Sequence, residues 1–425
     1  MELTVIILLI SLFVFLMLGV PVAYSIMMSV IVAALFTNVD MIMVAERMFA
    51  AFEKFSLTAI VLFMLMGIIL SKTGATKKLV DFVESVVGGI TGGLSITLIW
   101  SCAGFGTLTG STTGTVAAIG TVMIPEMENR GYDRPFSAAL TASAGTLGHL
   151  IPPSIAGIVY GVALDVSIGR LFIALVIPAI ILGIAFSITC YFISKRRGLG
   201  RKGQKYAPGE RFRLFLGAAP ALVIPLAVIG GIYGGVFTPT EAGAIGVVAA
   251  AVLGGTVYRS KERSFLAAIK ESLLEASILA SIIMLIISVS SAFAYFFSIT
   301  QMPQLIASTL FGISLNPIII LLLFNLIMIV LGMFLDTLGL IIMMAPVIRA
   351  LFIPLDISLL YVGVLMVMNS SVGQISPPVG GNLYVACGVA NVSLEDISKQ
   401  IIPFILVVMG VLALLIVFPQ IVVLM

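Results

Sequence analysis

Charged side chains are scarce along this chain. Its 425 residues include only 22 Lys or Arg and 19 Asp or Glu, whereas 60% of the residues are hydrophobic. A soluble domain carries charge on about 25% of its residues, so a chain with only 10% charged residues cannot cover a water-facing surface. The deficit excludes an ordinary soluble protein and indicates that lipid is the outer solvent.

Histidine and cysteine are also rare, which limits the chemistry available. His149 is the only histidine, and this excludes a multi-histidine metal site. Cys102, Cys190 and Cys387 lie far apart without CxxC spacing, so we expect small apolar side chains rather than a disulfide framework or a metal site. There is no HExxH motif, and the GSTTG run at 110–114 lacks an obvious general base. We therefore expect no enzymatic activity.

The chain contains long, continuous apolar runs. A bilayer crossing needs about 20 apolar residues, so the chain can supply on the order of ten or more crossings or part-crossings. The runs do not alternate between polar and apolar residues, which favours helices over a β-barrel. No small-residue cleavage site follows the apolar run 1–18, so we expect a first membrane helix there rather than a cleaved signal peptide. The predicted fold class is an all-α polytopic membrane protein.

A basic segment at 194–213 divides the chain. It holds eight Lys or Arg residues against the single acid Glu210, and such a run beside membrane helices indicates the cytoplasmic side. The predicted organisation is a first repeat at 1–193, a cytoplasmic linker at 194–213 and a second repeat at 214–425.

Matching motifs support this duplication. GHLIPPS at 148–154 corresponds to GQISPPV at 373–379, with an offset of 225 residues (377 − 152 = 225). The sequence leaves parallel and inverted repeats open. Inverted repeats are common among transporters, whose substrate and ion sites lie at the midplane between them, and we adopt that interpretation. It places both termini on the outer face.

Glycines and small hydroxyl residues crowd the centre of the stretch 99–123. A continuous helix gains little from glycine, which costs up to about 1 kcal/mol relative to alanine. A re-entrant helical hairpin near 85–125 explains the pattern, because its tip needs tight turns and exposes backbone carbonyls. The alternative is a tightly packed helix pair with small-residue contacts. The counterpart in the second repeat is a hairpin near 310–350.

Asp336 lies in the second hairpin within an otherwise apolar run. A carboxylate at membrane depth costs several kcal/mol unless it is paired or hydrated, so it is a functional candidate. The alternative is an interfacial or helix-capping role. Glu241 in TPTEAGAIG is a similar isolated acid. A helix start capped by Thr238 or Thr240 is the natural interpretation, and a gating or substrate-binding role is the alternative.

Two double prolines, Pro152-Pro153 and Pro377-Pro378, interrupt apolar stretches at matching positions. Proline removes a backbone donor and breaks the preceding helix, so each pair frees carbonyl oxygens at one level of the membrane. Such oxygens suit a sodium ion, and half-helix N-termini at that level attract an anion. A simple proline kink is the alternative at each pair. The unwound turns are expected to contain Gly148, Ile151, Gly373 and Ser376.

These segments resemble the large membrane subunit of tripartite ATP-independent periplasmic (TRAP) transporters over essentially the whole chain. The motifs that carry the resemblance are FGTLTGSTTGTVAAIG, SAGTLGHLIPPS, TPTEAGA, GMFLDT and VGQISPPVGGNLYVA. The resemblance implies an elevator-type transporter of the bacterial inner membrane, coupled to sodium through at least two sites. It implies scaffold and transport domains that are interleaved along the chain. It also implies two partners, a small four-helix membrane subunit and a soluble periplasmic substrate-binding protein. His149 and Gly381 depart from the usual family pattern.

The resemblance also implies site residues. Substrate, a small organic acid such as a carboxylate or sulfonate, is expected between the hairpin tips. A stand-alone sodium–carboxylate carrier is the alternative function, and a passive channel suits isolated carboxylates and broken repeats less well. The first sodium site would use Thr109, Ser111, Gly148, Ile151 and Pro153; the second would use Asp336 or Thr337 with Gly373, Ser376 and Pro378; substrate would lie near Ser111, Thr112 and Asn382, with Glu241 as a further candidate.

Overall fold

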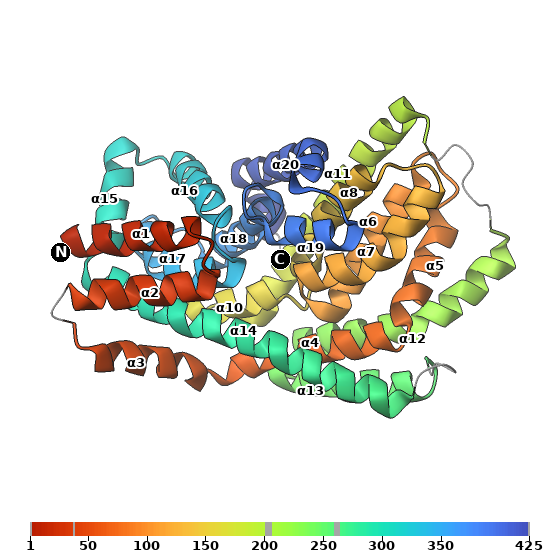
Figure 1. The fold of residues 1–425 in the computed structure, drawn as a ribbon, viewed down its shortest axis with the longest axis horizontal. Helices are drawn as coiled ribbons and strands as arrows, with labels where there is room; N and C mark the ends of the chain where they lie inside the picture. Colours follow the sequence, from red (N-terminus) through yellow and green to blue (C-terminus); the bar gives the residue numbers. More distant parts are fainter. Residues whose placement is uncertain (1, 37–38, 200–205, 259–263, 424–425) are drawn as a thin grey trace.

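The computed structural model describes residues 2–36, 39–199, 206–258 and 264–423, and all regular structure in those ranges is helical (Figure 1). The first half contains α1 (Glu2–Met17), α2 (Val22–Leu35), α3 (Met41–Ala50), η1 (Ala51–Glu53), η2 (Phe55–Leu57), α4 (Thr58–Lys72), α5 (Ala75–Val87), α6 (Gly93–Thr109), α7 (Thr112–Asn129), α8 (Arg134–Gly145), α9 (Leu147–Leu150), α10 (Ile155–Leu164) and α11 (Ile168–Arg197).

The second half opens with the 26-residue helix α12 and ends with a very short helix. It contains α12 (Pro208–Tyr233), α13 (Pro239–Gly255), α14 (Phe265–Ile299), α15 (Met302–Ile313), α16 (Pro317–Gly332), α17 (Thr337–Phe352), α18 (Leu359–Ile375), α19 (Gly381–Ala390), α20 (Leu394–Val417) and α21 (Gln420–Val423).

Five of the described helical segments are long and apolar enough to cross a bilayer. They are Phe55–Lys72, α11, α12, α14 and α20. A sixth candidate is a broken one, because α8 and α9 together are bent by 45° against α10. Nine further apolar helices have 10–17 residues. The protein is therefore a multi-pass membrane protein in which many apolar helices are shorter than a full crossing.

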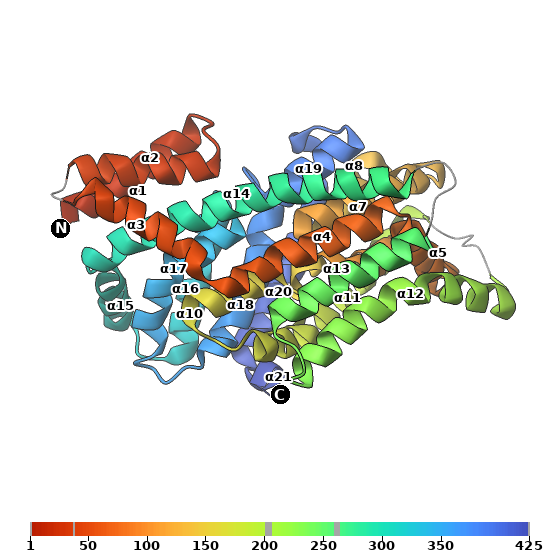
Figure 2. The same cartoon turned by 90° about the horizontal axis from the view of Figure 1, so that it is seen from below.

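The helices α4, α12, α13 and α14 form an outer layer along one side of the molecule. α14 runs beside α4, which packs against α13, and α13 packs against α12 (Figures 1 and 2). The shorter helices α6–α10 and α16–α19 lie inside this layer, together with α20. This layer, α4 with α12–α14, is called the scaffold layer below.

Two equivalent corners end the broken helices. Asp165 ends α10 with φ 60° and Asn391 ends α19 with φ 52°, both in the left-handed region that Asn and Asp tolerate better than most residues. Ser167 and Ser393 then cap α11 and α20 by accepting hydrogen bonds from Arg170 N and Asp396 N. Both pairs are 226 residues apart (391 − 165 = 226; 393 − 167 = 226). The same left-handed residue and serine cap thus connect α10 to α11 and α19 to α20.

The basic linker is shorter in the structure than in the sequence-based prediction. α11 continues to Arg197, and α12 begins at Pro208. Cations are favoured in the last turn of a helix because they face its negative dipole end, and α11 ends with Lys195 to Arg197. Proline fits the first helical position because its missing N–H would be unpaired there. The predicted linker residues 200–205 lie outside the described ranges.

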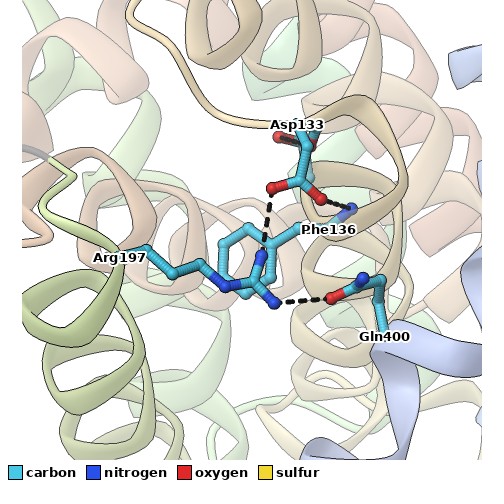
Figure 3. Close-up of polar contacts among 5 residues, drawn as sticks. Asp133, Phe136, Arg197 and Gln400 are labelled. Carbon is cyan, nitrogen blue, oxygen red and sulfur yellow. Dashed lines mark hydrogen bonds and ion pairs between the residues drawn. The ribbon is translucent and has the colours of Figure 1, made fainter.

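Arg197 connects three helices beside this linker (Figure 3). Its guanidinium donates to Asp133 Oδ1 at 3.0 Å and to Gln400 Oε1 at 2.8 Å, and it lies 5.0 Å from the centre of the Phe136 ring. Asp133 also caps α8 by accepting from Phe136 N. The arrangement fixes the ends of α8, α11 and α20 relative to one another.

We expect Arg197→Ala to lower the free energy of unfolding by about 1 kcal/mol, because the bonds are partly exposed and each contributes modestly. Arg197→Lys keeps the charge but loses the two-pronged geometry, so its effect should be intermediate. Thermal unfolding in nanodiscs measures both, with Arg196→Ala as the control from the same turn. An equal loss of stability in Arg196→Ala would show that the net charge of this turn, and not the contacts of Arg197, stabilises the fold.

Candidate functional site

The tip of the first hairpin gathers hydroxyl groups around one turn. α6 ends at Thr109, Gly110 turns the chain with φ 61°, and Ser111 caps α7 by accepting from Gly114 N at 3.3 Å. Thr109 Oγ1 lies 3.3 Å from Thr115 Oγ1, which donates to the Ser111 carbonyl at 2.7 Å. Three oxygens of the tip therefore lie on one side of the turn.

Gly148 of the broken helix packs directly on these oxygens. A Cβ atom added to Gly148 would lie 2.6 Å from Thr115 Oγ1 and 2.7 Å from the Ser111 carbonyl oxygen. On the neighbouring turn of α6, a Cβ on Gly106 would lie 2.6 Å from Gly148 Cα. The position requires glycine because only a residue without a side chain permits so close an approach.

The chain after the first proline pair also contacts this tip. Ile155 N donates to the Gly110 carbonyl at 3.3 Å, and a Cβ on Gly110 would collide with the Pro153 carbonyl oxygen. The backbone N–H of Ile151 donates a hydrogen bond to the Leu147 carbonyl. The structure thus brings Thr109, Ser111, Gly148 and Pro153 together, with Ile151 in the adjoining unwound turn.

The second hairpin repeats the helix cap and the glycine contact of the first. Asp336 caps α17, and its Oδ2 accepts from Leu338 N at 2.9 Å. It stands 225 residues after Ser111 (336 − 111 = 225), which caps the equivalent helix. A Cβ on Gly373 would lie 2.5 Å from the Gly332 carbonyl, so a glycine contact joins this hairpin to its broken helix too. Asp336 therefore caps a helix at the tip, which is the capping role that the sequence left open, and its functional role stays a prediction.

A cavity of about 170 Å³ opens at this second tip. Asp336, Gln374 and Gly381 line it, and Val22 at the start of α2 lies opposite. Gln374 Nε2 donates to Thr337 Oγ1 at 3.0 Å. Among the described residues, Gln374 Oε1 and Ser376 Oγ are buried oxygens without a hydrogen-bond partner. Buried polar groups are normally paired, so these oxygens have free capacity for a ligand.

Thr112 and Asn382 both lie close to Gly145 of α8. A Cβ on Gly145 would lie 3.4 Å from the Thr112 carbonyl and 3.5 Å from Asn382 Nδ2. Asn382 is fully buried at the start of α19 and donates to the Ala142 carbonyl at 3.0 Å, whereas its Oδ1 has no partner within the described ranges. The N-termini of α7 and α19 therefore lie close to the same point of α8.

Glu241 takes part in a different arrangement. Its carboxylate accepts from Thr238 N at 2.8 Å and from Thr238 Oγ1 at 2.9 Å, forming a capping box at the start of α13. α13 belongs to the scaffold layer and packs on α4 and α12. The structure does not bring this residue to either hairpin tip. Its carboxylate has the helix-start role that the sequence indicates, and its substrate-binding role stays a prediction.

Two residues at the tips were not singled out from the sequence. Gln374 lies inside the motif GQISPPV, and Thr115 lies inside the run STTGT. A polar amide next to the broken-helix glycine was the available signal for Gln374, because an amide at membrane depth needs a partner. Thr115 could be placed only once the register of α7 against Gly148 was known.

Family comparisons agree with this architecture. The family model described as "Tripartite ATP-independent periplasmic transporter, DctM component" matches residues 9–421. The chain belongs to the DctM family of TRAP transporter large permeases. It is 34% identical over 405 residues to the isethionate TRAP transporter permease DctMQ of Oleidesulfovibrio alaskensis, covering 94% of this chain and 62% of that protein. The DctM-family chain thus spans less than two thirds of that relative's length.

Two further relatives have lengths closer to that of the DctM-family chain. The C4-dicarboxylate large permease DctM of Pseudomonas aeruginosa is 34% identical, with 89% of this chain and 87% of that protein covered. The sialic acid large permease SiaM of Vibrio cholerae is 32% identical, with 95% and 93% covered. Among solved structures, the Alcanivorax borkumensis YdaH transporter shares the fold with a TM-score of 0.61 at 14% identity, covering 88% of this chain and 87% of that one. The chain therefore belongs to a transporter family by sequence, and its helical architecture has a counterpart in a solved transporter.

Proposed function

We propose that this chain is the large transmembrane subunit of a sodium-coupled tripartite transporter that imports a small organic anion by elevator-type alternating access. The observation that carries the proposal is the pair of hairpin tips, each packed through a glycine contact against a helix broken at a double proline. Family membership supports the transporter class and the multi-pass topology.

Sodium fits the oxygens at both tips. The first set is Thr109 Oγ1, Thr115 Oγ1 and the Ser111 carbonyl, and Gly148 closes it. The second combines the Asp336 carboxylate with the unpaired oxygens of Gln374 and Ser376. Hard cations prefer oxygen ligands such as carboxylates, carbonyls and hydroxyls. The remaining predicted ligands, Ile151, Pro153, Thr337, Gly373 and Pro378, would contribute through their backbone or by shaping the turn.

An organic anion fits the helix N-termini near the tips. α7, α17 and α19 begin at Thr112, Thr337 and Gly381, and helix N-termini favour negative charge. Relatives of this chain are named for C4-dicarboxylate, sialic acid and isethionate, so the substrate class we propose is small carboxylates or sulfonates. Asn382 Oδ1 can only accept, which suits a substrate hydroxyl better than its carboxylate.

The proposed topology has two inverted repeats in the bacterial inner membrane, with the basic linker in the cytoplasm. The hairpins and broken helices would move together against the scaffold layer. The partners we propose are a small four-helix membrane subunit and a soluble periplasmic binding protein, as the naming of the family as tripartite and periplasmic suggests. The matching hairpins and corners of the two halves support the repeats.

Proteoliposome uptake tests this function. The chain is reconstituted with the proposed small membrane subunit, an inward sodium gradient and the proposed binding protein loaded with a labelled organic acid. Uptake is expected only when all three components and sodium are present. Sodium-driven uptake by the chain alone would overturn the tripartite assignment and favour a stand-alone sodium–carboxylate carrier.

A further inference from the structure

The single histidine joins the two broken helices. His149 is only 3% exposed and lies on α9, one residue after Gly148. Its Nε2 is 3.0 Å from Ser371 Oγ and 3.5 Å from Ser370 Oγ, both on α18. These residues are more than 220 positions apart in the sequence, so the contact is a direct bridge between the two halves.

Each end of this bridge adjoins a hairpin contact. Gly148, next to His149, packs on the Ser111 carbonyl at the first tip. Gly373, two residues after Ser371, packs on the Gly332 carbonyl in the second hairpin. Ser154 also donates to the His149 carbonyl and so ties the two sides of the first proline pair together. A continuous path of packed groups therefore runs from one tip to the other through the imidazole.

We propose that His149 is the positioning residue that couples the two cation sites. This inference rests on the proposed function, because it assumes that cations occupy both tips. Among the described residues, its side chain contacts Ser370 Oγ, Ser371 Oγ and the Val367 backbone, all on α18, and none of the tip oxygens is among these partners. A cation that orders the turn at Gly148 fixes the imidazole, and the bond to Ser371 orders the turn at Gly373. The second cation then binds to a site that is already arranged, which is positive coupling.

Sodium binding to the purified full chain in nanodiscs measures this coupling without substrate or transport. For two equal sites coupled about fivefold, the Hill coefficient is about 1.4. We expect His149→Leu to lower it to about 1 while two sodium ions still bind. His149→Gln retains a hydrogen-bonding group and should restore part of the coupling.

Ser371→Ala removes the nearer of the two serine partners and should also lower the Hill coefficient. The double variant His149→Leu/Ser371→Ala should be no more impaired than His149→Leu alone, because His149→Leu already removes the bond to Ser371. The matched control is Ser143→Ala, a buried hydroxyl of α8 bonded only within its own helix, to the Ala139 carbonyl at 2.8 Å. It should leave the Hill coefficient unchanged.

The outcomes separate this inference from the proposed function. A wild-type chain that binds no sodium overturns the proposed function, and the coupling with it. Two bound ions with an unchanged Hill coefficient in Ser371→Ala and His149→Leu overturn only the coupling. Loss of one ion in His149→Leu would show a local defect of the first site and would also contradict the inference. If His149→Leu does not fold, the Hill coefficient of Ser371→Ala alone tests the coupling.

Discussion

Gly148→Ala is expected to reduce sodium-dependent uptake by about 100-fold or more. The added methyl group would lie 2.6 Å from Thr115 Oγ1 and 2.7 Å from the Ser111 carbonyl, so it occupies the space in which those oxygens would meet a cation. Misplacing reacting or binding groups by about 1 Å is enough for losses of this size. Initial uptake rates in proteoliposomes at a range of sodium concentrations provide the measurement.

The control for this variant is Gly388→Ala in α19, where an added Cβ meets no atom within 4 Å. It should transport like the wild type and unfold at a similar or slightly higher temperature, because alanine favours helix over glycine. Sodium-induced thermal stabilisation separates a blocked site from a misfolded chain. A Gly148→Ala protein that is stabilised by sodium as strongly as the wild type would refute the first site.

Asp336→Asn is expected to raise the half-saturating sodium concentration at least about tenfold while leaving the unfolding temperature nearly unchanged. Asparagine caps helices about as well as aspartate, so the bond from Leu338 N can persist. The negative charge that would balance a cation at membrane depth is lost, and charge interactions are strong there because the dielectric is low. Asp336→Ala should lose both the cap and the charge.

Asp40→Asn is a closely matched control for Asp336→Asn. Asp40 caps α3 with its Oδ1 2.9 Å from Ile42 N, the same geometry as Asp336, but on the exposed surface. The sodium dependence of the Asp40→Asn variant should match that of the wild type. Equal sodium dependence of Asp336→Asn and wild type would leave Asp336 with a capping role only.

The local construction of both tips could be predicted from the sequence because it depends on residues with strong backbone preferences. Glycines at Gly110 and Gly148 permit the turn and the close approach, and the proline pairs stop the helices wherever they occur. Gly148 and the first proline pair recur 225 positions later as Gly373 and Pro377-Pro378, the same offset as from Ser111 to Asp336, whereas Leu335 stands at the position equivalent to Gly110.

Contacts between distant segments could not be predicted in the same way. The bonds from Gln374 to Thr337 and from His149 to Ser371 depend on how whole helices are rotated against each other. No periodicity within one segment encodes that rotation. The first hairpin also begins at Gly93 rather than near 85, because α5 continues to Val87 as a separate amphipathic helix.

α14 is longer than the hydrocarbon core of a bilayer is thick. Its 35 residues extend about 52 Å at 1.5 Å per residue, well beyond a hydrocarbon thickness of about 30 Å. Lys72 of α4 is paired with Glu275 at 2.9 Å and with Glu271 at 3.6 Å near the start of α14. Such a charged cluster belongs at the headgroup level, and residues 276–299 beyond it extend about 36 Å, enough to traverse the acyl chains with a modest tilt. With residues 276–299 across the acyl chains, the ion pairs of Lys72 would therefore lie at the headgroup level.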